Sequence, residues 1–318
     1  MHPQAHAMTE ETFPTFEEDE LRALFDKQDY VVDDEVVIPV LLTLRLGKPL
    51  LVEGPPGSGK TELGKVLADG LDTELIRLQC YEGLAAENTL YEWNYTKQLL
   101  SVQSDERGVA DGASDDAGSV FEESFLLERP LLSALSNEHK KPPVLLIDEI
   151  DRADQEFEAL LLEVLSDFQV SIPELGTIEA SVPPIVIITS NRTRGLSDAL
   201  KRRCLYLNME PPSFERECEI IQRKVPTLPS ATVAQLCGVV QRLRAEPLVK
   251  QPGVAETLDW SQALDALDAA DDLHPALLEQ TLSCLLKDTE DIGRIDDEML
   301  TTLLEAGSKA RAEATDHD

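Results

Sequence analysis

The feature that most constrains this chain is a short glycine-rich stretch directly after the apolar run Leu50–Val52. The stretch reads Gly54-Pro55-Pro56-Gly57-Ser58-Gly59-Lys60-Thr61. Glycines at this spacing let the backbone bend so that its N–H groups point inward, where they can bind phosphate oxygens. Apolar residues then recur at helical spacing from Leu63 to Leu71, which predicts a helix whose N-terminus favours the same negative charge. The sequence therefore predicts a strand, a phosphate-binding loop and a helix in succession.

The two residues that end this loop predict a nucleotide and a metal ion. Lys60 is expected to reach the β- and γ-phosphates of ATP, and the hydroxyl of Thr61 to ligate Mg²⁺. A glycine-rich turn that binds no nucleotide is the alternative. The residue pattern and its strand–loop–helix context agree, and together they favour the nucleotide.

A second apolar run ends in two carboxylates. The run from Val144 to Ile147 predicts a strand buried on both faces, and Asp148 and Glu149 follow it directly. Doubly wound sheets bind their ligands at the carboxyl ends of such strands. Asp148 is therefore predicted to hold Mg²⁺, directly or through water, and Glu149 to orient and polarise the water that attacks the γ-phosphate. A pair of surface carboxylates is the alternative, and the loop at Lys60 argues against it.

A third apolar run, Ile185–Ser190, also ends in a polar residue. Asn191 follows it and is placed to hold the attacking water or the γ-phosphate. A short helix over Ser197–Lys201 is predicted next, followed by Arg202 and Arg203. Flanking elements are predicted as helices over 17–30, 36–46, 125–135 and 155–168, the last with Asp154 as its N-cap, and as strands over 73–78, 169–172, 177–180 and 205–208.

The chain changes character at Pro211-Pro212, after which every apolar pattern is helical. We therefore expect three parts: an acidic, partly flexible N-terminal segment over residues 1–30, an α/β nucleotide-binding domain over 31–210, and an all-helical domain over 211–318. Residues 101–120 are rich in Asp, Ser, Gly and Ala and predict a flexible insertion within the second part. The aromatic segment around Trp93 is read either as core packing or as an exposed loop that contacts a client.

The net charge limits the partners of this protein. The chain has 61 acidic residues against 28 basic ones, a formal net charge of −33. No basic surplus exists to displace counterions, which argues against nucleic acid and anionic lipid as partners. We interpret the excess as a solvated acidic surface of the kind that halophilic proteins from a high-salt cytoplasm carry; one acidic docking face is the alternative.

The cysteines and the apolar runs point to the cytoplasm. The five cysteines are scattered without a C-x-x-C pair, so reduced thiols are expected and not a disulfide or metal framework. No apolar run approaches the length of a membrane span, and the first residues lack the pattern of a signal peptide. We therefore expect a cytoplasmic protein without a membrane partner.

Together these motifs resemble the AAA+ ATPases. GPPGSGKT and LLIDEIDRA are typical of that class, and DFQVSIPELGTIEA before ITSNRTRGLSDALKRRC resembles its MoxR family. The stretches LQCYEGLAAENTLYEWNY and PGVAETLDW are similar to the CoxD-like subgroup, which is encoded beside carbon monoxide dehydrogenase-type operons. The resemblance runs from about Val36 to the end of the helical part.

This resemblance implies a fold, an activity and partners. The α/β domain would have a five-stranded parallel sheet, the helical part would be a lid, and subunits would form a hexameric ring with ATP at the interfaces. Asn191 matches sensor 1, and Arg203 matches the arginine finger that reaches a neighbour's site, with Arg202 as the fallback and a plain surface basic pair as the alternative. The family works with a partner that contains a von Willebrand factor A (VWA) domain, as a chaperone in assembly, remodelling or metal-cofactor insertion of a client enzyme complex.

One departure from the family pattern concerns the lid. Many AAA+ proteins place an arginine, sensor 2, at the start of a lid helix, whereas this chain has Gly253-Val254-Ala255-Glu256-Thr257 there.

Three rival functions remain beside a Mg²⁺-dependent ring ATPase. They are a nucleotide-gated assembly scaffold with negligible turnover, a DNA-directed motor and a P-loop kinase. The net charge argues against the motor, and the Asp148-Glu149 pair suits activation of water better than phosphoryl transfer to another substrate.

Overall fold

The computed structural model describes residues 16–85, 87–93, 126–136, 139–172, 176–268 and 273–315. The predicted insertion over 101–120, the first half of the N-terminal segment and the aromatic residues after Trp93 lie outside these ranges. The chain forms two compact units. The first contains residues 34–53 and 61–208, and the second contains residues 25–33, the loop 54–60 and the chain from Met209 onward.

A parallel sheet forms the centre of the first unit. Its strands lie in the order β2-β5-β8-β1-β9 and all neighbours are parallel, which confirms the predicted five-stranded sheet. The strands are β1 (Leu50–Glu53), β2 (Leu75–Gln79), β5 (Val144–Asp148), β8 (Ile185–Ser190) and β9 (Leu205–Asn208). Gln79 pairs with Asp148, and Glu53 pairs with Ser190 and with Asn208. The polar residues that end these strands therefore share one edge of the sheet.

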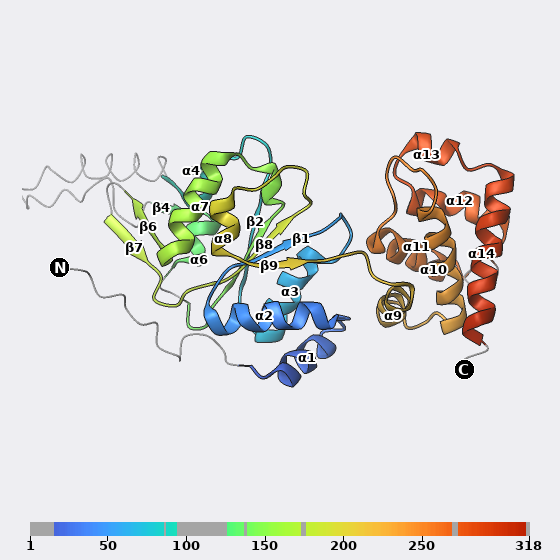
Figure 1. Cartoon of the computed structure of the whole chain (residues 1–318), viewed down its shortest axis with the longest axis horizontal. Coiled ribbons are helices and arrows are strands. Elements are labelled where there is room, and N and C mark those ends of the chain that lie inside the picture. Colours follow the sequence, from blue (N-terminus) through green and yellow to red (C-terminus); the bar gives the residue numbers. More distant parts are fainter. Residues whose placement is uncertain are drawn as a thin grey trace, which may run out of the picture. The chain divides into compact units, whose positions relative to one another are not determined.

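Helices cover both faces of this sheet, as the continuous apolar runs predict. On one face, Leu145 and Ile147 join a core cluster with Phe157 of α7 (Gln155–Asp167), and the same cluster contains residues of α6 (Pro130–Ala134) and Leu200 of α8 (Asp198–Arg203). On the other face, Leu146 packs against Gly64 of α3 (Lys60–Leu71). Figure 1 shows α2 (Asp34–Leu46) on the same side as α3, and α6 and α7 on the opposite side.

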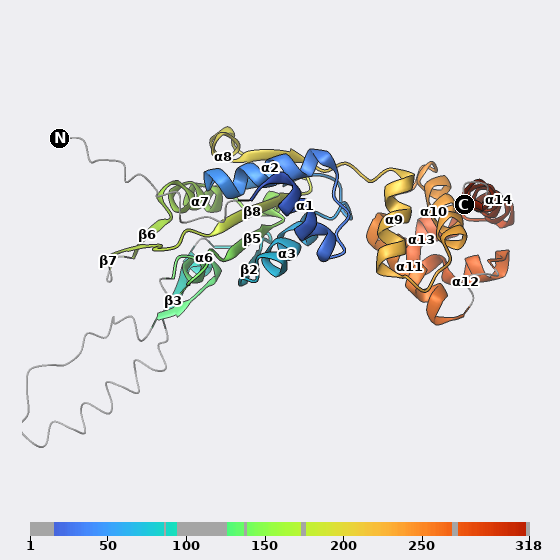
Figure 2. The same ribbon diagram turned by 90° about the horizontal axis from the view of Figure 1, so that it is seen from below.

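Two short antiparallel pairs lie outside the central sheet (Figure 2). One pairs β3 (Tyr91–Trp93), which follows α4 (Glu87–Leu90), with β4 (Leu126–Glu128). The other pairs β6 (Gln169–Ile172) with β7 (Gly176–Glu179), as predicted from the sequence. The predicted helix over 125–135 is wrong in its first half, because residues 126–128 pair with β3. Pro130 instead begins α6, where a missing N–H costs nothing.

The second unit is built from helices. Their bounds are α9 (Phe214–Lys224), α10 (Ser230–Arg244), α11 (Val254–Ala266), α12 (Pro275–Leu285), α13 (Thr289–Gly293) and α14 (Asp297–Thr315). Trp260 is fully buried in their common core, and its indole N–H donates to the Thr281 hydroxyl at 2.9 Å. The sequence predicted helices over 214–223, 232–244, 254–270, 275–286 and 296–312, and it missed the single-turn α13. The chain also forms α1 (Glu18–Lys27). Within the described ranges, no helix is both long and apolar enough to span a bilayer.

Candidate nucleotide-binding site

The glycine-rich loop folds tightly around its own lysine. Gly57 and Gly59 have φ angles of 77° and 89°, in the left-handed region that other residues enter only at a cost. The Lys60 ammonium donates to the carbonyl oxygens of Gly54 at 2.9 Å and Pro55 at 2.6 Å, and only 5% of this side chain is exposed. The loop therefore holds a buried positive charge directly before α3.

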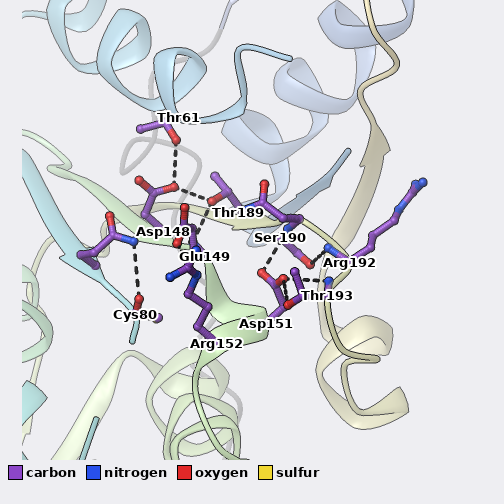
Figure 3. Close-up of polar contacts among 12 residues, drawn as sticks. Thr61, Cys80, Asp148, Glu149, Asp151, Arg152, Thr189, Ser190, Arg192 and Thr193 are labelled. Carbon is purple, nitrogen blue, oxygen red and sulfur yellow. Dashed lines mark hydrogen bonds and ion pairs between the residues drawn. The ribbon is translucent and has the colours of Figure 1, made fainter. Parts of the chain in front are cut away.

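The two predicted metal ligands are bonded to each other. The Thr61 hydroxyl donates to Oδ1 of Asp148 at 2.9 Å (Figure 3). The Thr189 hydroxyl donates to the same oxygen at 2.5 Å and accepts the Glu149 backbone N–H at 3.0 Å. The sequence analysis missed Thr189; its signal was a hydroxyl near the end of a buried strand beside β5. These bonds fix the Asp148 carboxylate, which is almost completely buried.

The other oxygen of Asp148 is held by an arginine that sequence reasoning missed. Arg77 donates to Oδ2 of Asp148 from Nε at 3.2 Å and from Nη2 at 2.5 Å. Nη2 also donates to Oε1 of Gln79 at 2.7 Å. Residues two apart on a strand share one face, so Arg77 and Gln79 both lie on the side of β2 that reaches Asp148. The available signal was a lone cation between the apolar residues Ile76 and Leu78 of the strand.

The set of oxygen donors suits Mg²⁺. A hydroxyl and a carboxylate are hard ligands, and Mg²⁺ takes few of these from protein while phosphate and water supply the rest. No group of three or more His, Cys, Asp or Glu residues that could hold a metal occurs in the described part of the chain. A magnesium ion at Thr61 and Asp148 would therefore depend on the phosphates of a nucleotide.

Glu149 lies beside Asp148 but its carboxylate has another partner. Its backbone is left-handed, with φ 56° and ψ 49°, and it begins the turn η2 (Ile150–Arg152). Its Oε2 forms an ion pair with Nε of Arg152 at 2.7 Å. A left-handed residue with a side chain costs about 1–2 kcal/mol, so the surrounding bonds must impose this geometry.

Asp151 anchors the loop that contains Asn191. Its carboxylate is 3% exposed and accepts the Asn191 backbone N–H at 3.0 Å, and the Thr193 N–H at 2.9 Å and hydroxyl at 2.5 Å. Burial raises the pKa of Asp151, but these hydrogen bonds outweigh burial and hold that pKa below its ordinary value. The structure thus ties Asn191, at the end of β8, to the turn that follows Glu149.

A second buried carboxylate anchors the start of α8. Glu158 accepts the Ser197 backbone N–H at 2.9 Å and pairs with Arg194 at 2.7 Å. Ser197 in turn caps α8 by accepting the Leu200 N–H at 3.3 Å. The predicted arginines, Arg202 and Arg203, are exposed in the last turn of this helix, and neither forms an ion pair within the described ranges.

Arg192 reaches away from Asp148 (Figure 3). Its backbone is left-handed with φ 60°. Its guanidinium donates to Oε2 of the buried Glu53 at 3.3 Å and to the Tyr206 hydroxyl at 3.0 Å, and it also bonds to Asn208. Although it is next to Asn191 in sequence, Arg192 therefore belongs to the β1–β9 side of the sheet edge.

The start of α11, where sensor 2 was expected, meets the loop through backbone. A Cβ added at Gly57 would lie 3.1 Å from the Cα of Gly253, and the Gly253 N–H donates to Oε2 of Glu256 at 2.9 Å. The nearby Arg244 pairs with Glu217 at 2.6 Å. Glu217 is fully buried and also accepts the Thr257 hydroxyl at 2.7 Å. This arginine is therefore committed to the helical core.

Cys80 lies directly after β2, next to Asp148. Its N–H donates to the Asp148 carbonyl at 2.8 Å. Burial, followed by the negative charges of Asp148, Asp151 and Glu149, raises the pKa of the Cys80 thiol to about 12. The thiol is therefore neutral at physiological pH and is a packing group here.

Comparison with known proteins shows what this region is similar to. Residues 49–204 match the AAA domain family, in its dynein-related subfamily. This stretch, which contains the loop, the carboxylates and α8, is therefore similar to AAA domains. It has a P-loop fold and is followed by a helical region.

Relatives and solved structures are similar at lower levels. An uncharacterized protein of Staphylococcus haemolyticus is 24% identical over 280 residues, which cover 86% of this chain and 94% of the relative. One of Staphylococcus saprophyticus is 23% identical over 244 residues, covering 74% and 83%. Among solved structures, the Thermotoga maritima RuvB Holliday junction branch migration motor is 19% identical with a TM-score of 0.43, covering 89% of this chain and 73% of RuvB.

Proposed function

We propose that this protein hydrolyses ATP in a Mg²⁺-dependent reaction at the site around Lys60, Thr61 and Asp148. The observation that supports this most is the hydrogen bond from Thr61 to Asp148. It joins the end of the phosphate-binding loop to the carboxylate that would share a magnesium ion with it. The loop from Gly54 to Thr61 would bind the phosphates, with Lys60 at the β- and γ-phosphates.

Glu149 is proposed to activate the attacking water, and Asn191 to hold that water or the γ-phosphate. Both lie at the sheet edge where β5 and β8 end. In the structure Glu149 is paired with Arg152, so productive binding requires this carboxylate to turn from Arg152 toward the water. Closure of the site on nucleotide or partner binding is the kind of step that would drive that change.

Glu149→Gln tests this assignment, because the amide keeps the shape of the side chain and removes its capacity as a base. We expect ATP binding to stay within about threefold of the unaltered protein while steady-state phosphate release falls at least ~100-fold. The matched control is Glu156→Gln, an exposed acid of α7, which should leave both quantities unchanged. Normal turnover in Glu149→Gln would overturn the assigned role.

Arg203 is proposed to complete the site of a neighbouring subunit in a hexameric ring. Two features support this: Arg202 and Arg203 have no ion-pair partner within the described ranges, and both are exposed. On a chain of charge −33, an arginine without an acidic partner is available to bind the charge that develops on a transferring phosphoryl group. Mixing Arg203→Ala with Glu149→Gln subunits should restore part of the hydrolysis that each variant lacks alone. Arg202→Ala is the comparison, and it should remain active unless that residue is the finger.

The biological role that we propose is that of a cytoplasmic MoxR-type chaperone of the CoxD-like subgroup, with residues 31–210 as the ATPase domain and 211–318 as its lid. It would work with a VWA-domain protein on the assembly, remodelling or metal-cofactor insertion of a client enzyme complex. The sequence resemblance supports this role. Stimulation of phosphate release by a VWA-domain partner is the measurement that tests it.

A nucleotide-gated scaffold is the second candidate, and the Glu149–Arg152 ion pair favours it. A carboxylate paired with arginine is a weaker base toward water, so ATP could assemble a ring with negligible turnover. Sedimentation velocity with parallel phosphate release separates the two functions: a ring that forms with Mg·ATP but releases no phosphate, with or without partner, identifies the scaffold. RuvB is described as a Holliday junction branch migration motor. For the present chain, the net charge of −33 argues against a DNA-directed motor.

A further inference from the structure

The carboxylate of Asp148 already has a cation beside it. Arg77 contacts Oδ2 through two nitrogens, at 2.5 and 3.2 Å, while the Thr61 and Thr189 hydroxyls contact Oδ1 at 2.9 and 2.5 Å. Both oxygens of this almost completely buried group are thereby used. In the described part of the chain, Asp148 is also the acid with which Arg77 forms an ion pair.

Stability alone accounts poorly for this arrangement. The Arg77 side chain is 46% exposed, so water screens its attraction to the Asp148 carboxylate. Thr61 and Thr189 already supply hydrogen bonds to Asp148. Arg77 does supply a positive charge at the oxygen that a divalent cation would otherwise approach. Mg²⁺ sheds its water reluctantly and gains little from a carboxylate whose charge is already neutralised.

We propose that Arg77 is a resident counter-cation that excludes free Mg²⁺ from Asp148, so that the metal enters this site as its nucleotide complex. The phosphate oxygens of the nucleotide would add the ligands that let Mg²⁺ take Asp148 in exchange for Arg77. On this view Arg77 is a positioning residue that couples metal binding to nucleotide binding. The inference rests on the proposed role of Asp148 as a metal ligand.

The experiment measures Mg²⁺ binding in the absence of nucleotide. Isothermal titration with MgCl₂, in KCl concentrated enough to screen the acidic surface, is run on the unaltered protein and on Arg77→Gln. We expect the apparent dissociation constant for Mg²⁺ to be at least ~10-fold lower in Arg77→Gln than in the unaltered protein, which should show no saturation over the same range; a 10-fold change corresponds to about 1.4 kcal/mol. Far-UV circular dichroism first establishes that the variant is folded.

Three further variants identify the site. Arg129→Gln removes an arginine with the same 46% exposure that pairs with Glu92 elsewhere in the unit, and it should behave as the unaltered protein. Arg77→Lys keeps the charge and should also bind no free Mg²⁺. The double variant Arg77→Gln, Asp148→Asn should lose the site gained by Arg77→Gln alone.

Two results would overturn the proposal. One is equal Mg²⁺ binding by Arg77→Gln and the unaltered protein. The other is that Arg77→Gln needs more Mg²⁺ than the unaltered protein to bind ADP, because that would make Arg77 a support for the metal and not a competitor. Neither result depends on turnover. Failure of this inference therefore differs from failure of the proposed ATPase, which is judged by phosphate release in Glu149→Gln.

Discussion

Asp151 offers the sharpest test of how this site is held together. It is outside the set of residues proposed to contact nucleotide, yet it accepts hydrogen bonds from two backbone N–H groups and one hydroxyl of the loop after β8. The perturbations are Asp151→Ala, which removes every acceptor, and Asp151→Asn, which keeps the shape and one acceptor oxygen.

The expected magnitude follows from the contacts that are lost. In Asp151→Ala the N–H groups of Asn191 and Thr193 lose their acceptor. Both hydrogen bonds are partly buried, and each is expected to contribute about 0.5–1.5 kcal/mol net. The Thr193 hydroxyl can rotate toward another acceptor, so we exclude it. Asp151→Ala should therefore lower the free energy of unfolding by about 1–3 kcal/mol, and Asp151→Asn by about half as much.

The assay is urea unfolding followed by far-UV circular dichroism. Tryptophan fluorescence is less suitable because Trp260 is buried in the second unit. Asp72→Asn is the control: the Asp72 side chain is 96% exposed and pairs with Lys141 at the surface, so its loss should leave the free energy of unfolding nearly unchanged. A change of less than ~0.5 kcal/mol in Asp151→Ala would refute the reasoning, since the loss of two partly buried hydrogen bonds should cost more than that.

The same carboxylate predicts a dependence on pH. The folded-state pKa of Asp151 is lowered, so its stabilisation is present above the ordinary aspartate pKa of about 3.9 and is lost as pH falls through the folded value. The stability difference between the unaltered protein and Asp151→Asn should therefore be full at pH 7 and shrink below about pH 4. An unchanged difference at pH 3 would show that the bonds do not depend on the charge.

Three other predictions address the rest of the molecule. Burial raises the pKa of Cys80 and of Cys204 to about 12, so at pH 8 both should resist maleimide in the folded protein and react in urea; rapid labelling of either would contradict the packing. Arg244→Ala leaves the fully buried Glu217 charge unpaired and should destabilise the second unit by about 3–5 kcal/mol, whereas Arg242→Ala, at a partly exposed pair on the same helix, should cost at most ~1 kcal/mol. Screening of the −33 charge should raise the melting temperature by about 5 °C in molar KCl; no rise would count against a salt-adapted surface.

Local patterns predicted most of the fold correctly because the underlying signals are local. Continuous apolar runs predicted the buried strands β1, β5 and β8, and Asp154 does cap α7 by accepting the Phe157 N–H at 2.9 Å. Two predictions of secondary structure failed, one because of long-range strand pairing and one because the helix is short. Residues 126–128 follow β3 into an antiparallel pair and not the predicted helix. The one-turn α13 is too short for any periodicity to show.

The candidate site divides in the same way. The sequence by itself determined which groups bring the chemistry, because the loop from Gly54 to Thr61 and the pair Asp148-Glu149 are contiguous motifs with fixed spacing. Only the tertiary structure decided what surrounds them. Arg77 and Thr189 reach Asp148 from two other strands, because parallel strands far apart in sequence end at one edge of the sheet. Which charge neutralises which carboxylate depends on that edge, and no local pattern encodes it.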